Sequence, residues 1–184
     1  MNKTLVYGGA AVLALALGVG SALLWKGRTH AEPVDVPPPP AVAAAAPGLW
    51  QSSFADLQGK PQAFQQWRGK PLVVNFWATW CAPCREEIPE FIATQHAHGD
   101  KVRFVGLAID NPKDVAKFVA EFKIDYPVLT GEQEALELMR TEGNRLGALP
   151  FTLIYDAQGN KVATHAGRLD QAKLDNYLKP LLAK

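Results

Sequence analysis

The two cysteines of this chain, Cys81 and Cys84, lie three positions apart in the run Trp-Cys-Ala-Pro-Cys. A Cys-x-x-Cys pair that follows a buried strand and opens a helix is typical of thiol–disulfide exchange. The unpaired N–H groups and the dipole of a helix amino terminus stabilise an anion, which favours a thiolate at Cys81. Cys84, one turn further along, can then attack a mixed disulfide formed at Cys81. The pair therefore predicts a redox-active dithiol.

The same cysteine pair could instead hold a metal ion such as copper(I). The remaining ligands would then be histidines, of which the chain has four: His30, His96, His98 and His165. His96 and His98 stand at i and i+2 of an expected helix, so they do not share a helix face. We keep a copper(I)-binding module as an alternative and expect no metal at the redox site.

A thiol peroxidase is a further alternative, because a peroxide-reducing site uses one cysteine with an activating threonine and arginine. Thr79 and Arg85 flank the cysteine motif, but not in that pattern. We take the disulfide oxidoreductase as the first hypothesis and expect no cofactor. An assay of disulfide reduction discriminates it from a copper-binding module, because the reduction needs no metal whereas the binding role needs stoichiometric metal.

Hydrophobic periodicity predicts the elements that position the cysteines. Residues 72–77 are a short apolar run rich in branched and aromatic side chains, which indicates a buried strand directly before the motif. A helical pattern begins at Ala82. The other expected elements are a buried strand at 102–109, a helix around 115–122, an extended piece at 126–129, a helix at 134–141, a hairpin of 151–155 with 161–166, and a helix at 170–182 capped by Asp170. This order predicts an α/β fold in which helices flank a mixed central sheet.

Composition narrows the class of protein. The chain has 184 residues, of which 48% are hydrophobic and 20% are charged, as in a globular domain with some chain left over. The net charge is +1 and no basic block is present, which argues against nucleic acid as a partner. Two cysteines are too few for a disulfide-dense scaffold or for a four-cysteine zinc site.

Residues 5–25 contain no charged side chain, and a helix that spans a bilayer needs about 20 apolar residues. We predict an N-terminal membrane anchor within residues 1–28. A cleaved signal peptide is the alternative, with a small-residue site at Gly20, Ser21 and Ala22, but its apolar core usually has only about 7 to 15 residues. Basic residues on the two sides of the run balance each other, so the positive-inside rule gives no orientation.

A stretch rich in proline and alanine, residues 29–48, follows the expected anchor. The four prolines at 37–40 favour polyproline II and give a semi-rigid spacer. At about 3.1 Å per residue, this linker could hold a domain up to roughly 60 Å from the membrane. We assign the remaining residues, 49–184, to one α/β domain.

The residues around the cysteines resemble a known family. The runs 75–89 and 147–159 are similar to those of TlpA/ResA-like membrane-anchored thioredoxins, and the resemblance extends across residues 49–184. It implies a thioredoxin fold that acts as a thiol–disulfide oxidoreductase. It also implies that Cys81 is the nucleophile and Cys84 the resolving cysteine.

The resemblance also points to residues that contact substrate. Pro150 falls on the family's cis-proline, whose loop faces the two cysteines and contacts the bound substrate. Leu149 precedes this proline and Trp80 adjoins the nucleophile, so we expect Trp80, Leu149 and Pro150 to bind substrate. Without the resemblance, the sequence says only that a proline begins a strand, which a trans proline would also satisfy.

Acidic residues near the motif raise the question of proton transfer. Cytoplasmic thioredoxins carry a buried Asp at the position of Asn75, where it assists proton transfer, so the proton acceptor for Cys84 is left unassigned. Glu86, Glu87 and Glu90 follow the cysteines on the expected helix. We expect these three glutamates to form a solvated face near the helix amino terminus.

The resemblance implies a place and a class of partner. Family members are held outside the bacterial inner membrane and act mostly as reductants of protein disulfides, several in cytochrome c maturation or copper-site assembly. A tethered reductant suits a compartment in which disulfides form. We therefore expect a single-pass inner-membrane protein with its catalytic domain in the periplasm, disulfide-containing protein substrates and a membrane dithiol donor. Ala82 and Leu149 stand where some cytochrome-directed relatives carry Glu, which favours a general disulfide reductase.

Overall fold

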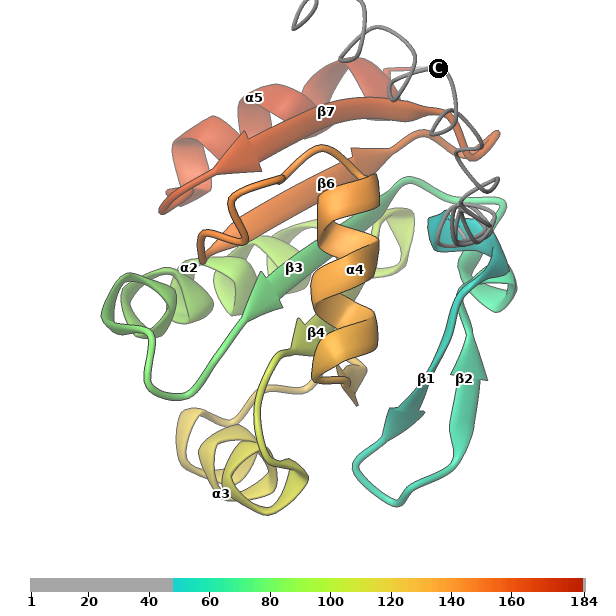
Figure 1. Ribbon diagram of the computed structural model, residues 1–184. Helices are drawn as coiled ribbons and strands as arrows, with labels where there is room; N and C mark the ends of the chain where they lie inside the picture. The colour runs from blue at the N-terminus through green and yellow to red at the C-terminus, as the bar shows by residue number, and fades with distance from the viewer. Residues whose placement is uncertain (1–47, 184) are drawn as a thin grey trace, which may run out of the picture. The chain divides into compact units, whose positions relative to one another are not determined.

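One mixed sheet organises the part of the chain that the computed structural model describes, residues 48–183 (Figure 1). Its seven strands lie in the order β2-β1-β5-β4-β3-β6-β7. The strands are β1 Ser53–Asp56, β2 Pro61–Ala63, β3 Leu72–Trp77, β4 Arg103–Ala108, β5 Val128–Thr130, β6 Phe151–Tyr155 and β7 Lys161–Ala166. The helices are α2 Ala82–His98, α3 Pro112–Phe122, α4 Gln133–Thr141 and α5 Gln171–Leu182, with short 3-10 turns η1 Leu49–Gln51, η2 Phe64–Trp67 and η3 Gly99–Lys101.

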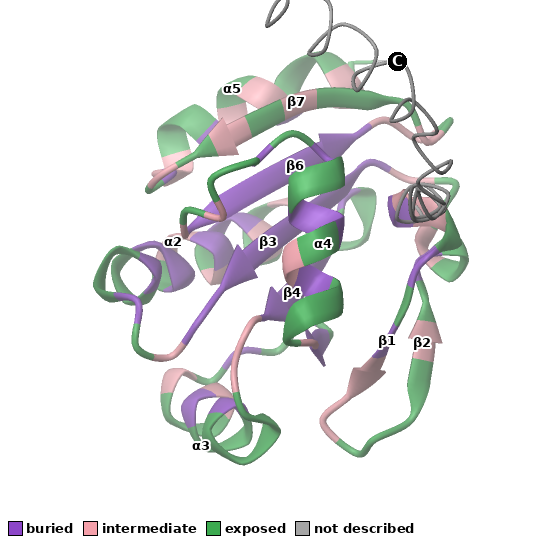
Figure 2. Ribbon diagram, in the orientation of Figure 1, coloured by how far each residue is buried: buried purple, intermediate pink, exposed green. Residues whose placement is uncertain are grey.

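Strand β3 is the central strand from which the cysteine motif leaves the sheet. It pairs in parallel with β4 and antiparallel with β6, and all six of its residues are buried (Figure 2). Successive side chains of a strand point to opposite faces, so two hydrophobic cores form. Val73 and Trp77 pack with α2, α3 and α5 on one face. Val74 and Phe76 pack with α4 and the 3-10 turns on the other. Asn75 shares the face of Val73 and Trp77, and so points at α2.

The predicted strands and helices from residue 72 onward are confirmed, with ends that differ by a few residues. The N-cap of α5 is Asp170, whose carboxylate accepts a hydrogen bond from the Lys173 N–H at 2.9 Å, as expected. The hairpin of β1 and β2 was not predicted. Only Phe54 is buried along these two short strands, so they show no clear alternation. Their place in the sheet depends on the distant pairing of β1 with β5.

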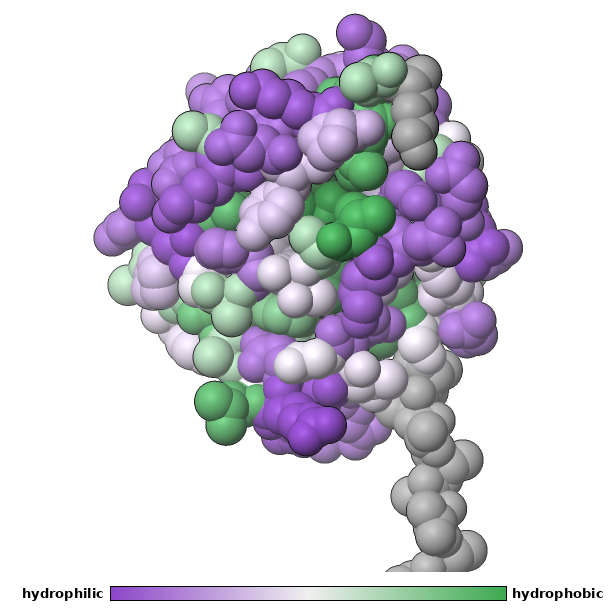
Figure 3. Space-filling model, turned by 90° about the horizontal axis from the view of Figure 1, so that it is seen from above, coloured by the Kyte–Doolittle hydropathy of each residue, from purple (hydrophilic) through white to green (hydrophobic). Residues whose placement is uncertain are grey.

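The surface is mostly hydrophilic on the side that carries β7 and α5 (Figure 3). Among residues 48–183 no helix combines the length and the apolar character needed to cross a membrane. The anchor expected in residues 1–28, and the linker expected at 29–48 apart from Gly48, lie outside the described residues.

The buried carboxylate of Glu142 connects the start of the domain, at Leu49, to strands β6 and β7. Its Oε1 accepts a hydrogen bond from the Leu49 N–H at 2.9 Å, and its Oε2 accepts bonds from Tyr155 Oη at 2.9 Å and Lys161 Nζ at 2.8 Å. Burial alone would raise the pKa of Glu142, but these three hydrogen bonds hold it below the ordinary value for glutamate. Because Tyr155 pairs with Leu72, this network lies at the end of β3 from which the strand begins.

Candidate active site

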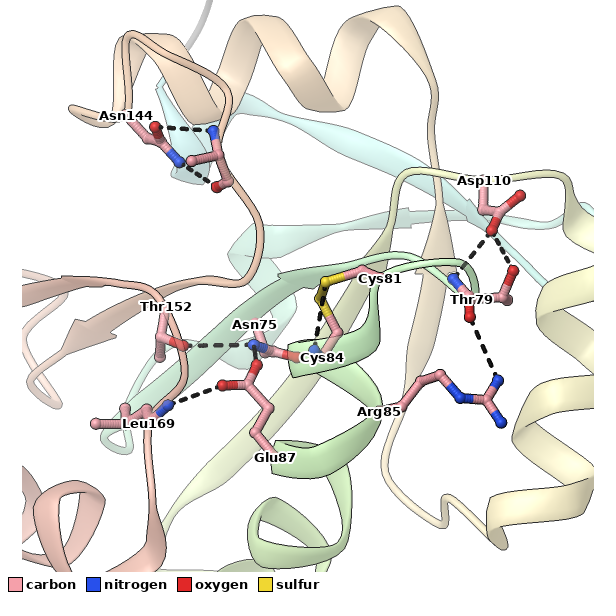
Figure 4. Close-up of a disulfide and its surroundings, with 11 residues drawn as sticks. Asn75, Thr79, Cys81, Cys84, Arg85, Glu87, Asp110, Asn144, Thr152 and Leu169 are labelled. Carbon is pink, nitrogen blue, oxygen red and sulfur yellow. Dashed lines mark hydrogen bonds between the residues drawn. A yellow bond between two sulfur atoms is a disulfide. The ribbon is translucent and has the colours of Figure 1, made fainter.

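The loop between β3 and α2 is held in place by the end of the neighbouring strand. Asp110, just beyond β4, accepts hydrogen bonds through Oδ2 from the Thr79 N–H at 3.0 Å and from Thr79 Oγ1 at 2.5 Å. The backbone N–H of Ile109 in turn donates to the Trp77 carbonyl at 2.8 Å. The two cysteines therefore start from a loop that is fixed to the sheet (Figure 4).

Cys81 and Cys84 form a disulfide with an S–S distance of 2.04 Å. Cys81 is the N-cap of α2, and its sulfur accepts a hydrogen bond from the Cys84 N–H at 3.3 Å. The helix amino terminus therefore points at the Cys81 sulfur, as the motif predicts. Cys81 keeps 5% of its surface exposed and Cys84 none. This difference fits an accessible nucleophile and a buried resolving cysteine.

The basic residue next to the pair, Arg85, is directed away from the sulfur atoms (Figure 4). Its guanidinium lies 5.1 Å from the ring centre of Phe118 and 5.2 Å from that of Phe122 on α3. Its Nη1 also donates to the Thr79 carbonyl at 3.4 Å. With Thr79 bound to Asp110 and Arg85 stacked on α3, neither of these side chains is arranged to activate a peroxide at Cys81.

The three residues expected to contact substrate lie on two loops at the same end of the sheet. Trp80 is 70% exposed directly before Cys81. The Leu149–Pro150 peptide is cis, as the resemblance implies, and leads into β6. Leu149 is half-buried and Pro150 is buried, with the Pro150 carbonyl accepting a bond from the Gly167 N–H at 2.9 Å. Phe151 pairs with Phe76, so Pro150 lies beside the end of β3 from which the cysteine loop departs.

The expected solvated face of glutamates on α2 is wrong for Glu87, whose side chain is completely buried. Its Oε1 accepts a hydrogen bond from Asn75 Nδ2 at 2.7 Å, and its Oε2 accepts one from the Leu169 N–H at 3.0 Å. Burial raises the pKa of Glu87 to about 7, although the two hydrogen bonds oppose the change. Glu87 lies one turn after Cys84 on the same helix face, because residues three apart are neighbours there. A carboxyl group that titrates near neutral pH therefore lies beneath the disulfide.

Asn75 joins this carboxyl group to the sheet. Its Nδ2 also lies 3.4 Å from Thr152 Oγ1, whereas its buried Oδ1 has no hydrogen-bond partner among the described residues. The Asn75 amide lies between Cys84 and the Glu87 carboxylate in Figure 4. The Asn75 amide thus connects α2 to the sheet and leaves one buried acceptor without a partner among the described residues.

Glu87 and its partners were missed by sequence reasoning, although one signal was present. Cys84, Glu87, Ile88 and Phe91 occupy one helical stripe of α2, and all four are buried. The spacing i, i+3, i+4 and i+7 marks the core-facing side of a helix. A glutamate in that stripe, directly after the cysteine pair, could have been recognised as a buried acid.

The two histidines of α2 point to different neighbours. His96 Nε2 lies 2.6 Å from Asp125, and His98 Nε2 lies 2.8 Å from Asp175 of α5. Within residues 48–183, no three side chains of His, Cys, Asp or Glu are grouped so that they could hold a metal ion. The histidines thus connect the end of α2 to two separate parts of the fold.

Comparisons with known proteins agree with this geometry. Residues 42–167 match the model of the AhpC/TSA family. The chain is 30% identical over 128 residues to the thiol–disulfide oxidoreductase ResA of Bacillus thuringiensis strain Al Hakam, which covers 68% of this chain and 72% of ResA. The chain belongs to the AhpC/TSA family as a ResA-like thiol–disulfide oxidoreductase. The enzyme is also 28% identical over 130 residues to the thioredoxin-like protein YneN of Bacillus subtilis, which covers 68% of this chain and 74% of YneN.

Similarity to a solved structure supports the fold assigned to this oxidoreductase. A thiol:disulfide interchange protein of the thioredoxin family from Chlorobium tepidum is similar to it with a TM-score of 0.64 and 30% sequence identity. The similarity covers 78% of this chain and all of that one. The expected thioredoxin-like α/β fold with a mixed sheet is therefore confirmed. The enzyme is a thiol–disulfide oxidoreductase with a Cys-x-x-Cys pair at the start of α2.

Proposed function

We propose that this oxidoreductase reduces disulfides of partner proteins. The proposal rests on the position of the Cys81 sulfur. This sulfur lies at the amino terminus of α2, whereas the side chain of the neighbouring Arg85 packs against α3. Ala82 and Pro83 add no cation between the cysteines. Among residues 48–183, the helix terminus is therefore the group that we expect to stabilise the Cys81 thiolate, and to do so moderately. A reduced form that is not strongly stabilised is a better electron donor.

The reaction follows from the two sulfur atoms and the acid below them. The Cys81 thiolate attacks one sulfur of a substrate disulfide, forms a mixed disulfide and releases the other substrate sulfur as a thiolate. The Cys84 thiol then loses its proton and attacks the Cys81 sulfur, which frees the second substrate thiolate and closes the Cys81–Cys84 disulfide. We propose that Glu87 takes the proton from Cys84, because it is buried one turn away and titrates near pH 7. Two electrons pass to the substrate in each cycle.

Substrate contact is proposed for the exposed Trp80 and for the loop of Leu149 and Pro150. These residues lie at the end of the sheet where Cys81 keeps its small exposed surface, so they can hold a polypeptide beside the attacking sulfur. The substrates that we propose are proteins with a disulfide, and the resemblance supports those in cytochrome c maturation or copper-site assembly. An external dithiol donor, which we place in the membrane, must return two electrons to the Cys81–Cys84 disulfide.

The direction of electron flow can be measured on the full-length protein by titration in glutathione redox buffers. We expect a reduction potential nearer to the value of about −270 mV for thioredoxin than to about −120 mV for the oxidant DsbA. Moderate stabilisation of the Cys81 thiolate is the reason. A potential above about −150 mV on that scale would show an oxidant and overturn the reductase proposal. The fold and the nucleophile would stand.

We also propose a location: residues 5–25 stay in the inner membrane and the catalytic domain lies in the periplasm. Support comes from the apolar run and from the chemistry, because a tethered reductant is useful where disulfides form. Alkaline phosphatase fused after Gly48 should be active, since it folds only where its own disulfides form. A cytoplasmic reporter fused at the same residue should be inactive. The reverse pattern would contradict the proposed location.

A further inference from the structure

The segment between β7 and α5 is bound to the active-site helix through three glutamates of that helix. Arg168 Nη2 pairs with Glu90 Oε1 at 2.5 Å, and its Nε lies 3.6 Å from Glu86 Oε2. The next residue, Leu169, donates its N–H to the buried Glu87. Glu90 also accepts a hydrogen bond from the Gln171 N–H at 2.7 Å. Arg168 and Leu169, two consecutive residues of this segment, therefore hold the acid below the cysteines and two further carboxylates of α2.

Glu86 and Glu90 are four residues apart on α2, so their carboxylates lie next to each other on one side of the helix. The planar guanidinium of Arg168 can contact both at once, which a lysine ammonium does less well. Arg168 is 43% exposed, so its contacts are made at the surface. Leu169, by contrast, is completely buried. Arg168 thus fixes the segment from outside while Leu169 reaches the acid inside.

Several polar or charged groups surround Glu87. Asn75 approaches it from β3 and the Leu169 N–H from the loop, both as hydrogen-bond donors. Glu90 on α2 and Tyr126 before β5 interact with it electrostatically, and the charge of Glu90 raises the pKa of Glu87. Arg168 is the group whose positive charge lowers that pKa. By pairing with Glu90, Arg168 also offsets the negative charge that opposes ionisation of Glu87.

We propose that Arg168 is a positioning residue that sets the proton affinity of Glu87 and, through it, the pH dependence of the step in which Cys84 resolves the mixed disulfide. The second half of this inference rests on the proposed function of Glu87. The contacts that carry it are the pairs of Arg168 with Glu86 and Glu90 and the adjoining Leu169 hydrogen bond. Loss of the guanidinium removes a favourable charge and leaves two carboxylates unopposed beside Glu87.

The direct test is a pH titration of the Glu87 side-chain carboxyl carbon by NMR in the oxidised full-length protein. Arg168→Met should move the midpoint up from about 7. We expect a change of about half a pH unit, because Arg168 is partly exposed and solvent screens its charge. Arg168→Lys keeps the charge and should restore most of the wild-type midpoint. Lys173→Met removes an exposed cation from the same region, where it pairs with Asp170, and should leave the midpoint unchanged.

A midpoint in Arg168→Met that equals the wild-type value would overturn the inference, and so would an equal change in Lys173→Met. The single-turnover rate of the resolving step, measured against pH, is the second readout. In Arg168→Met, the pH profile of this rate should shift by as much as the Glu87 midpoint does. In a protein that already carries Glu87→Gln, adding Arg168→Met should leave the pH profile of the rate unchanged. A changed midpoint with an unchanged rate profile would contradict the role of Glu87 in the proposed function, whereas an unchanged midpoint contradicts the role of Arg168.

Discussion

Replacement of the buried cysteine, Cys84→Ser, is expected to trap the enzyme in a mixed disulfide through Cys81. Attack by Cys81 needs only its own thiolate at the amino terminus of α2, so the first step persists. Resolution needs the second sulfur, so turnover should fall by roughly three orders of magnitude or more, as when other enzymes lose a group that acts directly in the reaction. Non-reducing electrophoresis after incubation with a disulfide-bearing protein measures both the adduct and its yield.

The matched control is Cys81→Ser, which keeps one cysteine in the chain but leaves the buried one. Cys84 has no exposed surface, whereas Cys81 keeps 5%. The Cys81→Ser variant should therefore form little adduct and should react slowly with an alkylating reagent. If this variant trapped substrate as well as Cys84→Ser does, the roles of the two cysteines would have to be exchanged.

The second large effect is expected from Glu87→Gln, which keeps the size of the side chain and removes the proposed proton acceptor. Loss of a positioned general base typically slows a step by about a hundredfold or more. The resolving step should slow by this order above pH 7, where wild-type Glu87 is ionised, and its dependence on pH near 7 should disappear. Stopped-flow measurement of single turnover gives the rate of this step separately from the first attack. Glu121→Gln, at an exposed position of α3 with no printed contact to this network, should leave it unchanged.

The same variant should change how stability depends on pH. Burial raises the pKa of Glu87 from 4.5 to about 7 in the folded state, so the folded protein binds this proton more tightly than the unfolded chain does. The stability that it contributes is complete below about pH 4.5 and is lost as the pH rises to about 7, a change of about 3 kcal/mol. Urea unfolding at pH 5 and pH 8 should show this loss in the wild type and not in Glu87→Gln. An equal loss in both proteins would show that Glu87 does not titrate as described.

Much of the fold can be predicted from local patterns of hydrophobic residues in the sequence. The run Leu72–Trp77 is buried on both faces, so it appears as a continuous apolar stretch, and β3 has those same bounds. The amphipathic spacing of Val115, Phe118, Val119 and Phe122 likewise predicts α3. The hairpin of β1 and β2 was not predicted, because its place in the sheet depends on pairing with the distant β5, which no local pattern indicates.

The active site likewise has one part that local sequence patterns predict and one part that they do not. The cysteine pair is predictable because its chemistry depends on a spacing of three residues and on the start of one helix. The arrangement around Glu87 is not, because Asn75, Thr152 and Leu169 come from three separate parts of the chain. Their meeting depends on the pairing of β3 with β6 and on the docking of the segment after β7 against α2.

The hydrogen bonds of Glu142 fix the start of the domain at one end of the sheet, away from the cysteines. Leu49, where the domain begins, is held at the Leu72 end of β3, whereas Cys81 leaves from the Trp77 end (Figure 1). At about 3.3 Å per residue, the strand alone separates these two ends by roughly 17 Å. Any attachment made through the amino-terminal side, whether to a bilayer or to an experimental support, therefore leaves the dithiol on the remote end of the domain. The proposed substrate proteins could approach it there without competing with the attachment for space.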